Sequence, residues 1–246
     1  IGGNTAIVKP PEAAPHTSAI VKKIINETFG EKYVRVVEGE KEEVTALIHA
    51  PFDYIFFTGS IMVGKVIAKA AAERLTPICL ELGGKSPVIV DQTANIDVAV
   101  SRIAWGKFNN AVQACIAPYY ILLHESVYDK FVKKMKKTIT EFYGTNIEES
   151  PDFGRIVNER QFDRLQLLLK KELKNITFGG QTNRENLYIE PTILENVSWD
   201  NPIMEDEIFG PIMPIMKYDE LPLAIHKIRQ LPKPLSAYLF SEHEKA

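Results

Sequence analysis

Short apolar runs alternate with longer amphipathic segments along the whole chain, and this alternation is what most limits its fold. In the first third of the chain, strand-like runs fall at residues 5–8, 33–37, 54–57 and 78–81. Between them, apolar residues recur at helical spacing in segments that start at Thr17 and then cover 41–49 and 62–75. Such alternation, with strands that are apolar along nearly their whole length, predicts parallel sheets covered on both faces. We therefore expect an α/β protein with doubly wound parallel sheets, whose ligands bind beyond the carboxyl ends of the strands.

A glycine-rich stretch at residues 83–87, Gly-Gly-Lys-Ser-Pro, interrupts the pattern and marks the expected boundary between two domains, 1–83 and 84–246. Beyond it the alternation continues with longer connections. The expected strands are 88–90, 119–123, 177–178, 212–216 and 237–240. The expected helices are 96–111, 127–142, 158–171 and 221–231.

Charge and cysteine usage exclude several classes of protein. The chain has 29 Lys and Arg against 32 Asp and Glu, a formal net charge of −3. This charge provides no positive electrostatic potential that would attract nucleic acid. No apolar stretch approaches the roughly 20 residues of a membrane helix. Cys79 and Cys115 form no CxxC pattern, and the histidines and cysteines lack the paired spacing of a metal site. We expect a cytoplasmic protein in a reducing compartment, without a nucleic-acid, membrane or metal partner.

A glycine turn at residues 57–66 resembles the P-loop pattern GxxxxGK[ST] of nucleotide triphosphatases. Gly59 and Gly64-Lys65 have the required spacing, and the turn follows a strand and opens a helix. A P-loop needs a hydroxyl after the lysine to hold Mg²⁺, whereas this chain has Val66. The triphosphatase alternative is therefore disfavoured. Two interpretations of the stretch remain: its helix N-terminus contacts a phosphate, or it is a plain tight turn.

Cys115 and Glu81 are the residues whose chemistry the sequence singles out. Cys115 lies among small and polar residues between a helix and a strand, which leaves a thiol nucleophile accessible, although a structural thiol is the alternative. Cys79 lies in an apolar strand and is expected to be a buried hydrophobe. Glu81 ends the same strand beside two glycines. We expect its carboxylate to be desolvated, its pKa raised, and its role that of a general base.

Taken together, five motifs resemble those of the aldehyde dehydrogenase superfamily in order and spacing. They are Gly3-Asn4 with residues 8–12, residues 57–60 with Gly64, Leu-Glu-Leu-Gly-Gly-Lys-Ser-Pro at 80–87, Gln-Ala-Cys at 113–115, and Glu-Ile-Phe-Gly-Pro at 207–211. The Trp-Gly-Lys-Phe run at 105–108 resembles the class 3, fatty-aldehyde-like branch. The resemblance implies NAD-dependent oxidation of an aldehyde to a carboxylic acid, with NADP as a possible coenzyme.

By this resemblance, 1–83 is a partial, Rossmann-like NAD(P)-binding domain and 84–246 a catalytic domain. Cys115 is the nucleophile that forms a thiohemiacetal and then a thioester, and Glu81 activates the water that hydrolyses the thioester. The implied cofactor contacts are Lys9 and Glu12 at the adenosine ribose, Gly59, Ser60 and Gly64 along the pyrophosphate, Leu82, and Glu207 with Phe209 at the nicotinamide ribose. Solvated charges, a loop carboxylate or a core phenylalanine are the ordinary alternatives for these residues.

The chain departs from the family pattern in its nucleophile loop and in its length. Val112 replaces a usual glycine and Ala114 a frequent hydroxyl residue, so a left-handed backbone at position 112 would be strained. The family's chain is about twice as long, and this one starts at Ile1 without Met. We therefore expect an internal fragment, inactive alone, of a protein that forms a homodimer. A non-catalytic remnant of the fold is the remaining alternative.

Overall fold

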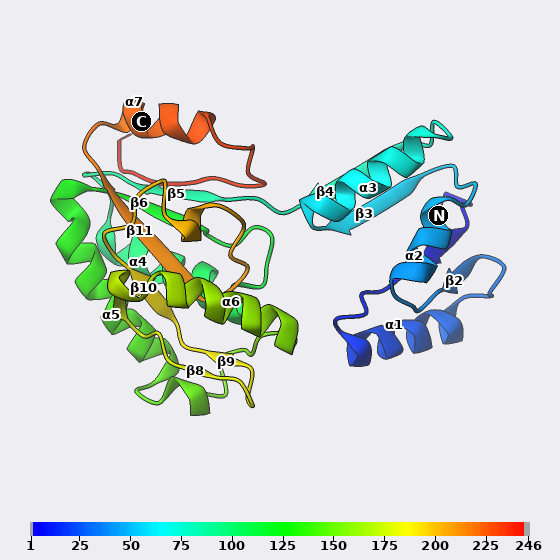
Figure 1. Ribbon diagram of the computed structural model, residues 1–246, viewed down its shortest axis with the longest axis horizontal. Helices are drawn as coiled ribbons and strands as arrows, with labels where there is room; N and C mark the ends of the chain where they lie inside the picture. The colour runs from blue at the N-terminus through cyan, green and yellow to red at the C-terminus, as the bar shows by residue number, and fades with distance from the viewer. Residues whose placement is uncertain (1, 244–246) are drawn as a thin grey trace. The chain divides into compact units, whose positions relative to one another are not determined.

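The computed structural model describes residues 2–243. They form two compact units, unit 1 up to Leu82 and unit 2 from Gly83 onward. Figure 1 shows the helices and strands of each unit. Both contain helices and parallel strands, and the predicted α/β class is confirmed. Among the described residues, no helix has the length and apolar character needed to cross a bilayer.

Unit 1 contains two parallel strand pairs, each with a helix in its connection. Its elements are β1 (Ala6–Val8), α1 (Pro15–Thr28), β2 (Val34–Val36), α2 (Lys41–Ile48), β3 (Ile55–Gly59), α3 (Ile61–Ala72) and β4 (Ile78–Leu82). β1 pairs with β2 and β3 pairs with β4, both in parallel. The order of elements matches the prediction, but β2 and β3 belong to different two-stranded sheets, so the four strands of unit 1 do not form one continuous sheet.

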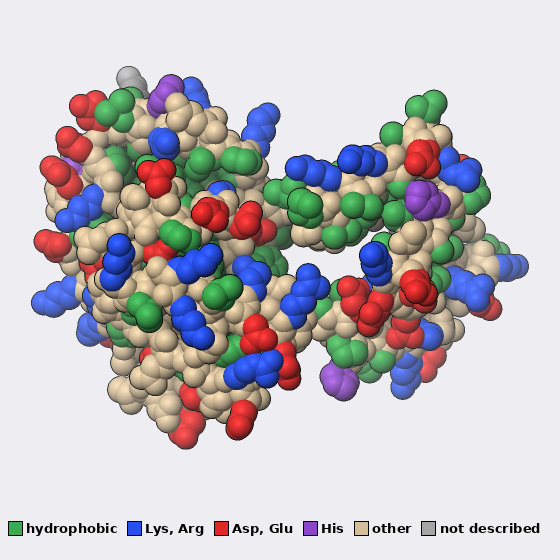
Figure 2. Space-filling model, in the orientation of Figure 1, with side chains coloured by type: hydrophobic (Ala, Val, Ile, Leu, Met, Phe, Trp, Pro, Cys, Tyr) green, Lys and Arg blue, Asp and Glu red, His purple; other side chains and the backbone are tan. Residues whose placement is uncertain are grey.

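Few apolar side chains are buried in unit 1. Of its described apolar residues, Val36, Ile67, Ala70 and Ala71 are buried. By contrast, Met62 on α3 is 72% exposed and Phe56 on β3 is 65% exposed. Figure 2 shows apolar side chains at the surface along α3. The helix α3 packs on one face of the β3–β4 pair, and no other described element of unit 1 has comparable contacts with the opposite, open face.

Unit 2 is built on a six-stranded sheet in the order β12-β5-β6-β11-β10-β7. These strands are β5 (Pro87–Val90), β6 (Tyr120–His124), β7 (Ile176–Phe178), β10 (Thr192–Leu194), β11 (Ile212–Tyr218) and β12 (Tyr238–Phe240). All neighbours are parallel except β7, which runs antiparallel to β10. The helices are α4 (Ile96–Phe108), α5 (Tyr128–Tyr143), α6 (Glu159–Lys171) and α7 (Leu221–Arg229). α4 and α5 pack against each other, and Figure 1 shows α6 in front of the sheet.

The core of unit 2 follows from the periodicity of its helices and the apolar character of its strands. In α5, Phe131, Met135 and Ile139 recur every four residues and are fully buried, while Lys133 and Lys137 face solvent. The predicted amphipathic helix is confirmed. Each such buried side chain contributes about 1.5–3 kcal/mol of transfer free energy. The central strand β6 is buried over Tyr120–Leu123, as expected for a parallel strand covered on both faces.

Three short elements of unit 2 were not expected. They are β10 and the hairpin of β8 (Thr182–Asn183) and β9 (Tyr188–Ile189). The helix expected at 96–111 ends at Phe108, and the chain continues as a 3₁₀ turn at Asn109–Val112. The two-residue strands β8 and β9 are too short to show a period-2 pattern in the sequence.

Candidate active site

The loop that leads to Cys115 has an uncommon backbone. Asn110, Ala111 and Val112 adopt consecutive left-handed conformations, with φ of 50°, 49° and 66°. Such conformations cost non-glycine residues about 1–3 kcal/mol each and persist only where the surroundings hold them. Val112 is 3% exposed, so its side chain is packed while its backbone is strained. The strain expected for a β-branched residue at this position is therefore present.

Side-chain hydrogen bonds hold the loop on both sides of Cys115. The Gln113 amide nitrogen Nε2 donates to the carbonyl oxygens of Asn110 (3.1 Å) and Arg155 (2.9 Å). Its Oε1 accepts from the N–H of Val157 at 2.8 Å. After the cysteine, the carbonyl of Ile116 accepts from the Tyr238 hydroxyl and, at 3.4 Å, from Ser236 Oγ. Cys115 is a free, half-buried thiol in a rigidly held turn, which is the setting that a positioned nucleophile needs.

Glu81 and Cys79 lie on the open face of the β3–β4 pair. The Leu82 side chain faces α3, because a Cβ placed on Gly64 of that helix would come within 2.7 Å of Leu82 Cδ2. Alternation along β4 then directs Cys79 and Glu81 to the opposite side. Glu81 is exposed and Cys79 is half-buried. The expected desolvation of Glu81 and full burial of Cys79 are therefore wrong for the described chain, since no element of unit 1 covers that face.

Lys9 and Glu12, both predicted at the adenosine ribose, contact each other. Lys9 Nζ lies 2.5 Å from Glu12 Oε2, three residues further along. The hydrogen bond from Lys9 lowers the pKa of the Glu12 carboxyl, which is therefore charged at neutral pH. The structure thus brings these two residues of unit 1 together as an ion pair just beyond β1.

The remaining positions predicted for the cofactor in unit 1 lie at the junction of β3 and α3. Gly59 ends β3, and Ser60 caps α3 by accepting a hydrogen bond from the N–H of Val63 at 3.3 Å. Gly64 is buried against Leu82, so its missing side chain permits close packing of helix and strand. The helix dipole and the free backbone N–H groups at the first turn of α3 favour binding of an anion there. Val66 lies exposed on α3 and offers no hydroxyl for Mg²⁺.

Glu207 and Phe209 lie beside the nucleophile loop in unit 2. The Glu207 carboxylate accepts a hydrogen bond from the backbone N–H of Gly84, and its partial burial raises the pKa of the carboxyl. Phe209 has a left-handed backbone with φ of 51°. A cavity of about 10 Å³, large enough for about one water molecule, is lined by both residues and by Val112 and Ala114, among others. The structure therefore brings the predicted nicotinamide-ribose contacts next to the residue that precedes Cys115.

Lys107 is a residue whose importance the sequence did not reveal. It lines the same cavity and is completely buried, and its Nζ donates to the carbonyl oxygen of Tyr119 at 3.1 Å. Burial lowers the pKa of its ammonium group to about 7. A basic residue in the last turn of a helix is ordinarily expected to be solvated, so no local signal distinguished it.

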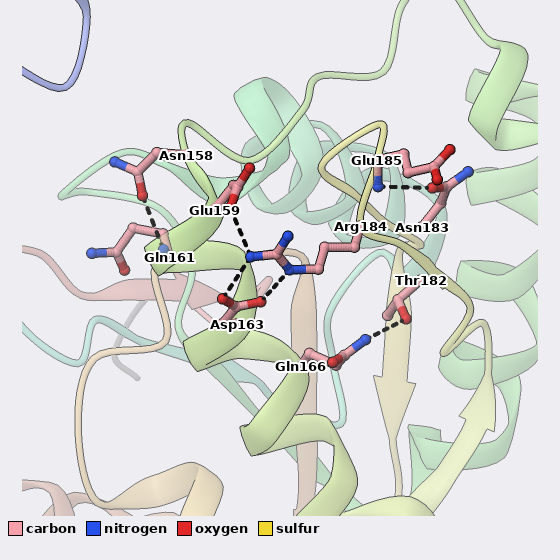
Figure 3. A network of polar contacts seen from close by, with 9 residues as sticks. All are labelled: Asn158, Glu159, Gln161, Asp163, Gln166, Thr182, Asn183, Arg184 and Glu185. Atoms are coloured by element: carbon pink, nitrogen blue, oxygen red, sulfur yellow. Dashed lines mark hydrogen bonds and ion pairs between the residues drawn. The ribbon is translucent and has the colours of Figure 1, made fainter.

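A larger hollow, of about 490 Å³, lies away from these residues at the β8–β9 hairpin. It is lined in part by Arg184, whose guanidinium binds Asp163 at 2.8 Å and Glu159 at 2.7 Å on α6 (Figure 3). The hairpin is thus fastened to α6 by an exposed ionic network. The described residues contain no group of three or more His, Cys, Asp or Glu side chains arranged to hold a metal ion.

A family model and several known proteins match almost the whole chain. The model of the aldehyde dehydrogenase family matches residues 1–246. The chain belongs to the aldehyde dehydrogenase family. One relative, 4,4'-diaponeurosporen-aldehyde dehydrogenase of Staphylococcus aureus (strain NCTC 8325 / PS 47), is 57% identical over 99% of this chain and 53% of its own length. Aldehyde dehydrogenase family 3 member A2 of Rattus norvegicus is 45% identical over 99% of this chain and 50% of its own.

Further relatives and solved structures bear on the coenzyme and the fold. The dimeric, NADP-preferring aldehyde dehydrogenase of Rattus norvegicus is 44% identical over 99% of this chain and 53% of its own. The substrate-bound structure of Staphylococcus aureus AldH superposes with a TM-score of 0.97 at 56% identity, covering 99% of this chain and 53% of that one. The Mycobacterium tuberculosis aldehyde dehydrogenase in complex with NAD+ superposes with a TM-score of 0.88 at 28% identity, covering 97% and 51%. The chain therefore spans about half the length of the relatives it matches.

Proposed function

We propose that the complete protein containing this chain oxidises an aldehyde to a carboxylic acid with NAD, or less readily NADP, as the hydride acceptor. The observation that carries the proposal is the strained turn that presents Cys115, held on both sides by Gln113 and Tyr238. A nucleophile needs a fixed position, and a strained loop held at two points provides it. A structural cysteine does not need such a loop.

The residues of this chain suit a dinucleotide. A glycine turn and the N-terminus of α3 supply N–H groups for a pyrophosphate, and the half-buried Glu207 carboxylate can accept from ribose hydroxyls. Lys9 offers a positive charge and Glu12 a negative charge to an adenosine ribose. When bound, the nicotinamide would accept a hydride from the substrate carbon.

The chemistry assigned to the protein itself has two parts. The Cys115 thiolate attacks the aldehyde carbon, forming a C–S bond and placing the electron pair on oxygen, and loss of hydride from that carbon leaves a thioester. Glu81 then removes a proton from a water molecule, and the resulting hydroxide attacks the thioester carbon. The C–S bond breaks, the acid leaves, and Cys115 returns as thiolate. An exposed carboxylate at Glu81 is open to water, as this step requires.

NADH formation from aliphatic and aromatic aldehydes, measured in the complete protein, tests the proposal. Cys115→Ser should abolish turnover, whereas Cys79→Ser should leave it within about twofold. ATP hydrolysis measured in parallel tests the P-loop alternative. Absence of NADH formation with every aldehyde, or full activity in Cys115→Ser, would contradict the proposal. The dimeric relative also supports the proposal of a homodimer, which analytical ultracentrifugation checks.

A further inference from the structure

Three side chains from separate parts of the chain bind the carbonyl oxygens of one continuous segment, residues 203–208. Each of them reaches two carbonyls. Lys85 Nζ donates to Met204 (2.5 Å) and Glu205 (2.6 Å), the Tyr119 hydroxyl lies against Ile203 (2.7 Å) and Asp206, and the Arg164 guanidinium donates to Glu207 (3.5 Å) and Ile208 (2.5 Å). Six consecutive carbonyl oxygens therefore have side-chain partners. Because a hydroxyl carries a single proton, Tyr119 donates to one of its two acceptors at a time.

This segment lacks the backbone pairing that would ordinarily hold it. It contains one 3₁₀ turn, Pro202–Met204, and otherwise runs as turns and irregular chain up to β11. Buried carbonyls need partners, and irregular chain cannot take them from a helix or a sheet. Lys85, Tyr119 and Arg164 supply them instead. We call these three side chains the carbonyl clamp.

The beginning of the segment is anchored independently. The N–H of Ile203 donates to Glu172 Oε1 at 3.2 Å, and Glu172 Oε2 accepts from Asn175 (2.6 Å) and Asn201 (2.9 Å). Glu172 is completely buried and is the C-cap residue of α6, so the entry to the segment is fixed to the core. The clamp then controls the course of the chain from this anchor to Glu207.

Each clamp residue is partly or largely withdrawn from water for this purpose. Desolvation lowers the pKa of Lys85 and of Arg164 and raises that of Tyr119. Lys85 and Arg164 donate to backbone oxygens of this segment. Withdrawing a cation from water costs free energy, and a surface ion pair avoids most of that cost. Because Lys85 and Arg164 are withdrawn from water and bind carbonyl oxygens, their bonds fix the course of the backbone.

We propose that the carbonyl clamp positions the Glu207 carboxylate, and so sets the affinity of the protein for the nicotinamide half of its coenzyme. Lys85, Tyr119 and Arg164 are thus positioning residues that act through Glu207. This inference rests on the proposed function for the coenzyme, although the effect of the clamp on the segment itself does not.

Amide hydrogen exchange in the complete protein, without coenzyme, tests the first half of the proposal. Tyr119→Phe removes one hydroxyl and keeps the ring, and it should speed exchange in residues 203–209 by about 2- to 12-fold, the effect of one lost hydrogen bond. Lys85→Met should do the same and Lys85→Arg, which can still reach two carbonyls, should restore slow exchange. Lys171→Met, at an exposed lysine of α6, is the matched control. Unchanged exchange in both Tyr119→Phe and Lys85→Met would overturn the clamp.

A double-mutant cycle on NAD dissociation constants tests the second half. Tyr119→Phe should weaken NAD binding several-fold in the native background and have no further effect in Glu207→Ala, because the clamp acts through that carboxylate. Equal effects in both backgrounds would show that Tyr119 acts by general stability, and would overturn the proposal. Should the native protein bind no NAD, the proposed function fails, while the exchange experiment still decides whether the clamp exists.

Discussion

The Glu207 carboxylate occupies the space that a side chain on Gly83 would need. A Cβ built on Gly83 would contact Oε2 of Glu207 more closely than real Cβ atoms approach any neighbour. The next residue, Gly84, donates its backbone N–H to the same carboxylate. Gly83 therefore leaves room for the Glu207 carboxylate, and Gly84 binds it.

Gly83→Ala should displace the Glu207 carboxylate and weaken NAD binding about tenfold or more without unfolding the protein. The new methyl group meets the far end of a flexible side chain, so the carboxylate moves and its hydrogen bond from Gly84 is lost. A hydrogen bond to a charged group contributes about 1.5–3 kcal/mol. Isothermal titration with NAD measures the effect.

Gly106→Ala is the matched control for this substitution. Gly106 lies in α4, and a Cβ there would meet Pro118 at ordinary distances of 3.5 and 3.6 Å. This variant should bind NAD normally and gain up to about 1 kcal/mol from helix propensity. Equal NAD affinity in the two variants would contradict the role of Gly83.

The strain at Ala111 predicts an unusual response to glycine. Ala111 and Ala104 are both buried, but Ala104 is helical and Ala111 is left-handed. Ala104→Gly should lower the free energy of unfolding by roughly 1 kcal/mol for backbone entropy and about 0.8 kcal/mol for the lost methyl group. In Ala111→Gly, relief of about 1–2 kcal/mol of left-handed strain offsets these losses. Urea unfolding measures both, and equal destabilisation would show that the turn is not strained.

The long elements were predictable from sequence because each carries its own periodicity. In α5, Phe131, Met135 and Ile139 mark the buried face without reference to any other element. The end of α4 was misplaced because Ala111 and Val112 are apolar and extend the helical pattern, whereas the chain has already turned left-handed there. The apolar character of a residue does not indicate whether its backbone φ angle is helical or left-handed.

For the candidate site, the sequence offered reactive residues in short motifs but not the contacts around them. Cys115 and Glu207 lie in short motifs that resemblance could identify. The side chains that bind the carbonyls of residues 203–208, namely Lys85, Tyr119 and Arg164, come from distant parts of the chain and meet only after the sheet has formed. The exposure of Glu81 was missed for a related reason, since burial of a strand face depends on which element covers it.

The Lys9–Glu12 ion pair bears on coenzyme preference. A free carboxylate at the adenosine ribose repels a 2′-phosphate, but Lys9 partly neutralises Glu12. Glu12→Gln should therefore raise kcat/KM with NADP relative to NAD by only about fivefold, in keeping with about 1 kcal/mol for one screened charge. Glu42→Gln, at an exposed position of α2, is the control. An unchanged NADP-to-NAD ratio in Glu12→Gln would remove Glu12 from the ribose site.

Buried Lys107 predicts a pH dependence of stability. Its folded-state pKa is about 7, below the ordinary value of 10.5, so between these values the unfolded chain binds a proton that the folded chain does not. The free energy of unfolding should therefore rise with pH across this window, by up to about 1.4 kcal/mol per unit. The isosteric variant Lys107→Met lacks this contribution.

Urea unfolding of the native protein and of Lys107→Met, at pH 7, 8 and 9, isolates the effect of Lys107 from other titrating groups. The free energy of unfolding of the native protein, relative to the variant, should increase at each step. At pH 7 the methionine variant should be the more stable of the two or equal to it, because the buried amine there still carries part of its charge and burial opposes that charge. A difference that stays constant from pH 7 to 9 would show that Lys107 remains charged in the fold, and that an unseen partner compensates it.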